Sequence, residues 1–450
     1  MNDIADKEEA GAYAVLKAAG IGEVPLYLLS FDKNGVCTSP RTRDRVLADA
    51  GSGKYSAVHV YSHGWNNVFQ EALAHYTEFF TEYFALREQA GVVRGDYRPM
   101  LVGIIWPSTA FLASGEVGPA LAGVPAGAPD PALAEVAAEL APDKRRRLAE
   151  LVGTGQPLGP DASAALAGLL QPLLGRDERP GATPADPDGA ASADDLLRNW
   201  GSKVQAGRPG QARALPDETA AAGAAGAQPA GLLEFLNPRE ILRKTTVFLM
   251  KDRAGVVGRS GVGDLVRDLL RASDTIQVHL TGHSYGARVM LSALASLRDQ
   301  RKVSSVLLLQ PAINAWCFAD HIDAPGRPAG AYRAALDNAA MPVYTTFSSR
   351  DMALGEFFGL AVRRPGEQGD LLSAAPDPRY AALGAAGPLG MPAGELATLT
   401  MLAQPTRYPA PAPGVRVVAL DGSVNGISAH GDVRNPYTEW AMVNLVGATP

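Results

Sequence analysis

One stretch, residues 276–288, constrains the fold of this chain more than any other. An apolar run ends in Gly282-His283-Ser284-Tyr285-Gly286, and a helical pattern follows from residue 287 to about residue 301. This order predicts a strand, a sharp turn and a helix, with Ser284 at the tip of the turn. The two glycines lack the Cβ atoms that would collide where the strand and the helix close together. The alternative interpretation is an ordinary glycine-rich turn.

The turn also carries a chemical prediction. A serine hydroxyl is a weak nucleophile unless it is presented beside a base and beside N–H donors. A tight turn presents a side chain in that way, which makes Ser284 a candidate nucleophile in a nucleophile elbow. The rest of the chain has to supply the base and the donors.

Similar apolar runs recur on both sides of the turn. They cover residues 24–31, 56–62, 99–106, 304–310, 343–349 and 415–420. Helical patterns lie between them, such as residues 69–88, whose apolar side chains recur every three or four positions. Strands that alternate with helices predict a mostly parallel central sheet with right-handed crossovers. The predicted fold class is therefore α/β.

Two segments rich in Ala, Gly and Pro interrupt this alternation. The first covers residues 109–232, and strands of the same kind resume after it. We therefore interpret it as an insertion that divides one domain into an N-terminal part, residues 1–108, and a C-terminal part, residues 233–450. A second insertion covers about residues 355–414.

The first insertion contains two helical patterns, at residues 131–151 and 161–174, whereas residues 180–229 have the composition of a loop. Two interpretations stay open. The insertion is either a lid over an apolar pocket, which would favour lipid-like acyl chains, or a flexible surface loop.

Composition excludes several classes of function. The chain has 450 residues, of which 46% are hydrophobic and 20% charged, as expected for a soluble globular protein. The net charge of −6 argues against a nucleic-acid partner. No apolar run is long enough to span a membrane, and the N-terminus has no signal-peptide pattern, so the expected location is cytoplasmic. No feature of the sequence sets an oligomeric state.

No cofactor is expected. The two cysteines, Cys37 and Cys317, lie far apart and form no metal-binding pattern. Residues 253–263 are rich in glycine but do not match Gly-x-Gly-x-x-Gly, and they follow a helix rather than a strand, which argues against phosphate binding.

Polar residues follow several of the predicted strands. Open parallel sheets place their sites at the carboxyl ends of the strands. His63-Gly64-Trp65 follows one run, Ser284 ends another, and Asp351 and His430 come after the last two. The order Ser, Asp, His along the chain is the order of the α/β-hydrolase architecture.

These segments resemble the α/β-hydrolase superfamily, and in particular esterase/lipase-like serine hydrolases of bacterial type. The residues that carry the resemblance are Tyr61-Ser-His-Gly-Trp-Asn-Asn67, Gly282-His-Ser-Tyr-Gly286, Ser348-Ser-Arg-Asp351 and Ser428-Ala-His-Gly431. The resemblance covers about residues 24–108 and 241–351 and the C-terminal strand and loop.

The resemblance implies an α/β-hydrolase fold and a role for each residue. Ser284 would attack a carbonyl carbon, His430 would take its proton, and Asp351 would orient His430. The backbone N–H groups of Tyr285 and Trp65 would bind the oxyanion. The implied substrate is a small-molecule carboxylic ester. A thioesterase or amidase on the same triad, and a non-catalytic binding protein, are the alternatives.

Other histidines have simpler interpretations than catalysis. His59 and His279 lie within predicted strands, as core or cross-strand residues, and His75 lies on a helix. His63 and His283 are expected to shape their loops, and His321 fits the chain order poorly. His59 and His63 are four residues apart but are not held on one helix face, so a metal site there is not favoured.

The acid has rivals as well. Asp320 or Asp323 follows the preceding predicted strand, where some hydrolases of this fold carry the acid. Asp421 and Asp432 lie close to the histidine loop and are interpreted as turn residues.

Overall fold

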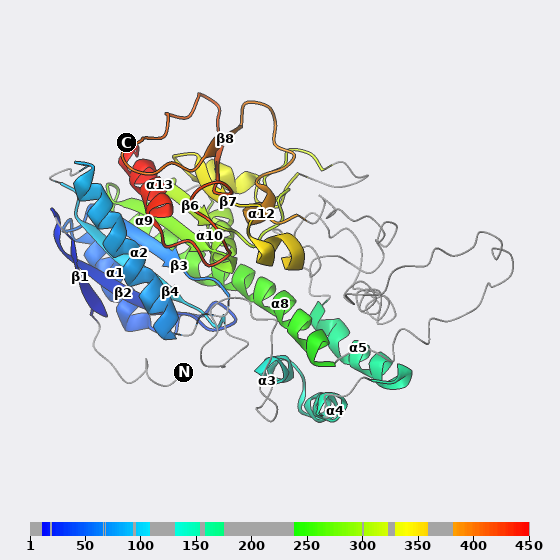
Figure 1. Ribbon diagram of the computed structural model, residues 1–450. Helices are drawn as coiled ribbons and strands as arrows, with labels where there is room; N and C mark the ends of the chain where they lie inside the picture. The colour runs from blue at the N-terminus through cyan, green and yellow to red at the C-terminus, as the bar shows by residue number, and fades with distance from the viewer. Residues whose placement is uncertain are drawn as a thin grey trace, which may run out of the picture.

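The computed structural model describes residues 11–18, 20–65, 67, 69–92, 96–108, 131–153, 158–174, 238–298, 301–322, 329–358 and 381–449 (Figure 1). Its strands are β1 Ala14–Ala18, β2 Gly22–Ser30, β3 Ala57–Ser62, β4 Pro99–Ile105, β5 Gln277–His283, β6 Ser305–Leu309, β7 Val343–Phe347, β8 Leu396–Thr400 and β9 Val417–Asp421. Within the described residues these nine strands form one sheet, in the order β1-β2-β4-β3-β5-β6-β7-β9-β8. β1 pairs antiparallel with β2, and the other neighbouring pairs are parallel. The predicted α/β class and mostly parallel sheet are confirmed.

Two strands were not predicted, and both lie at the edges of the sheet. β1 alternates between buried and exposed positions, and the side chains of β8 are half-buried or exposed. Neither has the continuous apolar run of a strand that is covered on both faces. β8 lies within the segment predicted as the second insertion, so part of residues 355–414 extends the sheet beside β9.

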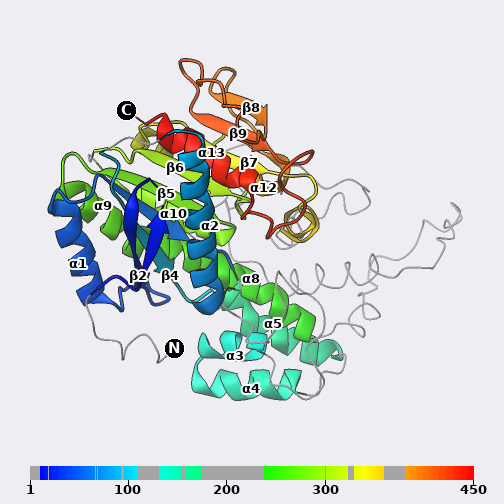
Figure 2. The same cartoon turned by 60° about the vertical axis from the view of Figure 1, so that its left-hand side comes forward.

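The sheet separates two apolar cores. Tyr27 and Leu29 point into one core, and the alternating Leu26 and Leu28 point into the other. The first core is covered by α1 Pro40–Gly51, α8 Pro238–Val256, α9 Gly263–Ala272 and α10 Tyr285–Ser296. The second is covered by α2 Phe69–Gln89 and α13 Pro436–Gly447, which pack side by side (Figure 2).

The glycine-rich segment at residues 253–263 is helical throughout. α8 continues through a π-helical turn, Val257–Val262, directly into α9. A Cβ atom on Gly258 would lie 2.4 Å from the main-chain oxygen of Val289 in α10. The absence of a side chain therefore lets this helix approach α10 at backbone distance.

The described part of the segment predicted as the first insertion is a small helical unit. Its helices are α3 Pro131–Ala138, α4 Pro142–Val152 and α5 Pro160–Leu174. Pro142 occupies the first turn of α4, because it cannot continue α3, and it divides the helix predicted at residues 131–151. The three helices lie beside α8 (Figure 1). They share an apolar cluster with it, to which α8 contributes Ile241, Leu242 and Leu249. The predicted loop at residues 180–229 lies outside the described residues.

None of the helices among the described residues is long and apolar enough to cross a membrane.

His59 and His279 face each other across β3 and β5, as predicted for cross-strand residues. Their rings stack with centroids 4.7 Å apart, and both are fully buried or nearly so. His59 Nε2 bonds Tyr97 at 2.6 Å, and His279 Nδ1 bonds Ser305 at 2.8 Å.

Candidate active site

The turn at Ser284 has the backbone geometry of a sharp elbow. Ser284 has φ 56° and ψ −122°, a conformation that residues with a side chain rarely adopt. A Cβ atom on Gly286 would lie 2.1 Å from the main-chain oxygen of Ser62, and one on Gly282 would lie 2.4 Å from that of Gly286. The end of β3, the end of β5 and the start of α10 therefore meet at distances that only glycine permits.

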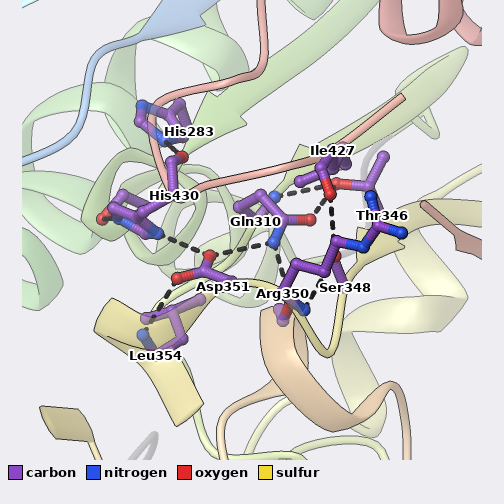
Figure 3. A network of polar contacts seen from close by, with 11 residues as sticks. His283, Gln310, Thr346, Ser348, Arg350, Asp351, Leu354, Ile427 and His430 are labelled. Atoms are coloured by element: carbon purple, nitrogen blue, oxygen red, sulfur yellow. Dashed lines mark hydrogen bonds and ion pairs between the residues drawn. The ribbon is translucent and has the colours of Figure 1, made fainter. Parts of the chain in front are cut away.

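The structure brings Ser284, His430 and Asp351 into direct contact. His430 Nε2 lies 2.9 Å from Ser284 Oγ. On the other side of the ring, His430 Nδ1 lies 2.8 Å from Asp351 Oδ2 (Figure 3). A carboxylate can only accept, so Nδ1 carries the proton and Nε2 presents a lone pair to the serine hydroxyl. These contacts link the ends of β5 and β7 with the loop after β9, all at the carboxyl ends of parallel strands.

The Asp351 carboxylate is fully enclosed by donors. Its Oδ2 atom also accepts from Gln310 Nε2 at 2.9 Å, and its Oδ1 atom accepts from the Leu354 N–H at 3.0 Å (Figure 3). The side chain of Asp351 has no exposed surface. A carboxylate removed from water requires hydrogen-bond donors, and the surroundings of Asp351 supply them.

The rival acids lie elsewhere or outside the described residues. Asp320 is largely exposed and pairs with Arg333 at 3.1 Å. Asp323 lies outside the described residues. Asp421 accepts from the Ser423 N–H, and Asp432 accepts from Ser428, as expected of turn residues.

The His63-Gly64-Trp65 loop lies against the elbow. A Cβ atom on Gly64 would lie only 2.8 Å from Ser284 Cβ. Asn67 braces this loop by donating to the main-chain oxygens of Gly64 at 3.2 Å and of Trp65 at 3.1 Å.

The two predicted oxyanion donors thus belong to segments beside Ser284. Tyr285 is the first residue of α10, and the N–H groups of a helix start point outward along its axis. The rings of Trp65 and Tyr285 lie with centroids 6.4 Å apart. Binding of an oxyanion by these N–H groups remains a prediction.

Two neutral histidines shape the loops. His63 donates through Nδ1 to the main-chain oxygen of Gly64 at 2.9 Å, and burial lowers the pKa of His63 to about 4. His283 donates through Nε2 to the main-chain oxygen of His430 at 3.0 Å (Figure 3). Burial is the largest cause that lowers the pKa of His283 well below its ordinary value, and the nearby His430 and His75 lower it further.

The described residues contain no group of three or more His, Cys, Asp or Glu side chains placed to hold a metal ion. His321 is exposed and takes no part in the contacts among Ser284, His430 and Asp351.

Sequence reasoning missed Gln310 and the segment around Gly384. Gln310 directly follows β6, so the search for polar residues at strand ends could have found it. Gly384, whose main-chain oxygen accepts from Gln310 Nε2 at 2.9 Å, lies in the Ala- and Gly-rich segment predicted as the second insertion, where no pattern marks it.

The chain matches no protein-family model, no curated protein and no solved structure. The contacts of Ser284, His430 and Asp351, rather than a relative, are therefore the basis for a functional assignment.

Proposed function

We propose that this protein is a serine hydrolase with an α/β-hydrolase fold that cleaves a carboxylic ester. The observation that carries the proposal is the position of the His430 ring, with Ser284 Oγ 2.9 Å from one nitrogen and Asp351 Oδ2 2.8 Å from the other. A strained turn at the end of a parallel strand, with glycines on both sides, supports it further.

In the first half of the reaction, Ser284 Oγ attacks the ester carbonyl while its proton passes to His430 Nε2. The resulting imidazolium is stabilised by the Asp351 carboxylate through the Nδ1–H bond. The C–O bond to the leaving group then breaks as His430 returns the proton to the departing alkoxide, which leaves as an alcohol. Ser284 is left as an acyl ester.

In the second half, water replaces the alcohol. His430 accepts a proton from the water, the oxygen attacks the acyl carbon, and the proton passes to Ser284 Oγ as the carboxylic acid departs. The N–H groups of Tyr285 and Trp65 are the proposed donors to the oxyanion in both halves. Losing one such donor typically costs about 3 kcal/mol of transition-state stabilisation. This chemistry requires no cofactor.

Labelling with a fluorophosphonate tests the proposal, because the probe reacts only with an activated serine. The wild-type protein should be labelled at neutral pH and should hydrolyse short nitrophenyl esters, and Ser284→Ala should lose both properties. Absence of labelling and hydrolysis in folded wild-type protein would favour the non-catalytic alternative. Nitrophenyl esters of increasing chain length, with a thioester and an anilide of the same acyl group, would then separate esterase from thioesterase or amidase.

A further inference from the structure

We propose that Gln310 is a positioning residue of the triad, whose side-chain amide holds the Asp351 carboxylate in the orientation that His430 requires. The inference rests on the proposed serine hydrolase function. Among the described residues Gln310 makes no hydrogen bond to Ser284 or His430, and we infer that it acts through Asp351.

The amide nitrogen of Gln310 bonds two acceptors at once. Nε2 lies 2.9 Å from Asp351 Oδ2 and 2.9 Å from the main-chain oxygen of Gly384. Both of its hydrogens are therefore used, one on the carboxylate and one on the backbone near α12, Leu383–Ala386. The carboxylate oxygen that receives the Gln310 hydrogen is the same one that accepts from His430 (Figure 3).

Thr346 sets which way the amide faces. Its hydroxyl donates to Gln310 Oε1 at 3.0 Å and accepts the Gln310 main-chain N–H at 2.9 Å. If the amide were turned over, its oxygen would face two acceptors, Asp351 and the carbonyl of Gly384. The hydrogen bonds therefore allow one orientation only.

The backbone of Gln310 is as constrained as its side chain. Its φ is 42°, in the left-handed region, and the residue has no exposed surface. A Cβ atom on Gly384 would lie 2.6 Å from the Gln310 carbonyl carbon, so the α12 backbone presses directly on this position. A non-glycine residue in this conformation persists only when its surroundings determine it, as they do here.

A fixed carboxylate matters most when His430 is charged. Asp351 Oδ1 accepts from the Leu354 N–H whether or not Gln310 is present. The hydrogen bonds of Oδ2 come from Gln310 and His430. Without the amide, the carboxylate can rotate about its last torsion and leave Nδ1 poorly aligned. The loss falls on the transition state rather than on substrate binding, so kcat should fall while KM stays unchanged.

Three variants test this role. Gln310→Met keeps the length and volume but removes the donor. Thr346→Val removes the hydroxyl that orients the amide. Thr345→Val is the matched control, because the Thr345 hydroxyl is buried one residue away on the opposite face of β7 and has no hydrogen-bond partner among the described residues.

We expect Gln310→Met to lower kcat for a nitrophenyl ester by about 100-fold, a loss that a displacement of a catalytic group by about 1 Å can cause. Thr346→Val should lower it less, and Thr345→Val should leave it within about twofold of wild type. KM should change little in each case. Melting temperatures identify any variant whose loss reflects unfolding, and kcat is then compared at a temperature where all variants are folded.

A double variant separates positioning from a general structural role. If Gln310 acts through Asp351, its effect should vanish once the carboxylate is gone, so Gln310→Met with Asp351→Ala should be as slow as Asp351→Ala to within about twofold. If the kcat losses of the two single variants multiply in the double variant, the proposal is overturned. A kcat of Gln310→Met equal to that of wild type would also overturn it.

Failure of the proposed function and failure of the proposed role of Gln310 give different results. If wild-type protein is not labelled by a fluorophosphonate at Ser284, the hydrolase assignment is wrong and the role of Gln310 falls with it. If wild-type protein is labelled and Gln310→Met is labelled equally fast, only the role of Gln310 is wrong.

Discussion

His283 Nε2 lies 3.0 Å from the main-chain oxygen of His430, so the residue before the candidate nucleophile holds the backbone of the candidate base. The rings of the two histidines lie with centroids 5.1 Å apart. A second tie reaches the same loop, because Ser348 Oγ donates to the main-chain oxygen of Ile427 at 2.9 Å. The loop after β9 is thus attached to the elbow on one side and to the end of β7 on the other.

His283→Asn should therefore lower kcat by about 10- to 100-fold, because its shorter side chain cannot reach the His430 carbonyl and the base loses its anchor. His283→Gln is the matched variant, since its Nε2 atom can reach about as far as the imidazole Nε2. It should retain most of the activity. Steady-state hydrolysis of a nitrophenyl ester measures both. Equal activity of the two variants would show that the hydrogen bond does not matter for the reaction.

Gly64→Ala should abolish most of the activity while leaving the protein folded. The new methyl group would lie 2.8 Å from Ser284 Cβ, so the loop or the elbow has to move. We expect at least about a 100-fold loss of kcat/KM and slower fluorophosphonate labelling, with a stability cost of about 1–3 kcal/mol from overpacking. Gly431→Ala is the control, because a Cβ atom there meets nothing within 4 Å. Similar losses in both variants would contradict the packing explanation.

The sequence was informative wherever chemistry requires a local pattern. Ser284 is marked by the glycines two residues before and after it. Only glycine at these positions lets β5, α10 and the loop after β3 approach one another closely. Asp351 and His430 are marked by their places after strands, since parallel strands bring their carboxyl ends together. The buried strands were predicted because side chains covered on both faces leave continuous apolar runs.

What the sequence did not reveal depends on contacts between distant segments. The contact between Gln310 and Gly384 spans 74 residues, and although Gln310 follows a strand, no pattern in the sequence marks Gly384 as its partner. The edge strands β1 and β8 are half exposed and carry no apolar run. The helical course of residues 257–262 was hidden because glycines that serve close helix packing resemble those of a loop.

Glu439 should make the protein less stable as pH rises. It is 1% exposed, and burial, together with the nearby Glu82, raises its pKa to about 9. The folded state keeps this proton up to about pH 9, whereas the unfolded state releases it near pH 4.5. Between these values the folded state binds more protons, so stability falls with pH, by up to about 3 kcal/mol at pH 7.

Glu439→Gln has the shape of the protonated carboxyl and cannot ionise. It should raise the melting temperature at pH 8 and change it little at pH 4.5. Glu88→Gln, on the exposed face of α2, is the control and should show no such dependence on pH. A Glu439→Gln variant that is less stable than wild type at pH 8 would mean that the carboxylate is ionised and paired in the folded protein.

Arg253 joins the helical unit of α3–α5 to the sheet. Its guanidinium donates to the main-chain oxygen of Pro107 at 2.8 Å and pairs with Glu135 and with Glu139, the latter at 3.3 Å. Lys33 also pairs with Glu139, at 2.9 Å. The Arg253 side chain is only 6% exposed, so the pair is largely shielded from water.

Arg253→Met should loosen α3 and α4 from the core. Removing the guanidinium takes the cation from Glu135 and leaves Glu139 paired with Lys33, and the loss of a buried partner of this kind costs about 3 kcal/mol. Hydrogen exchange should therefore quicken across residues 131–153 while the strands β3 and β5 keep their protection. Arg147→Met is the matched control, because the Arg147–Glu150 pair is exposed and contributes at most about 1 kcal/mol. Equal exchange in the two variants would mean that the shared apolar cluster with α8, and not Arg253, holds the helices in place.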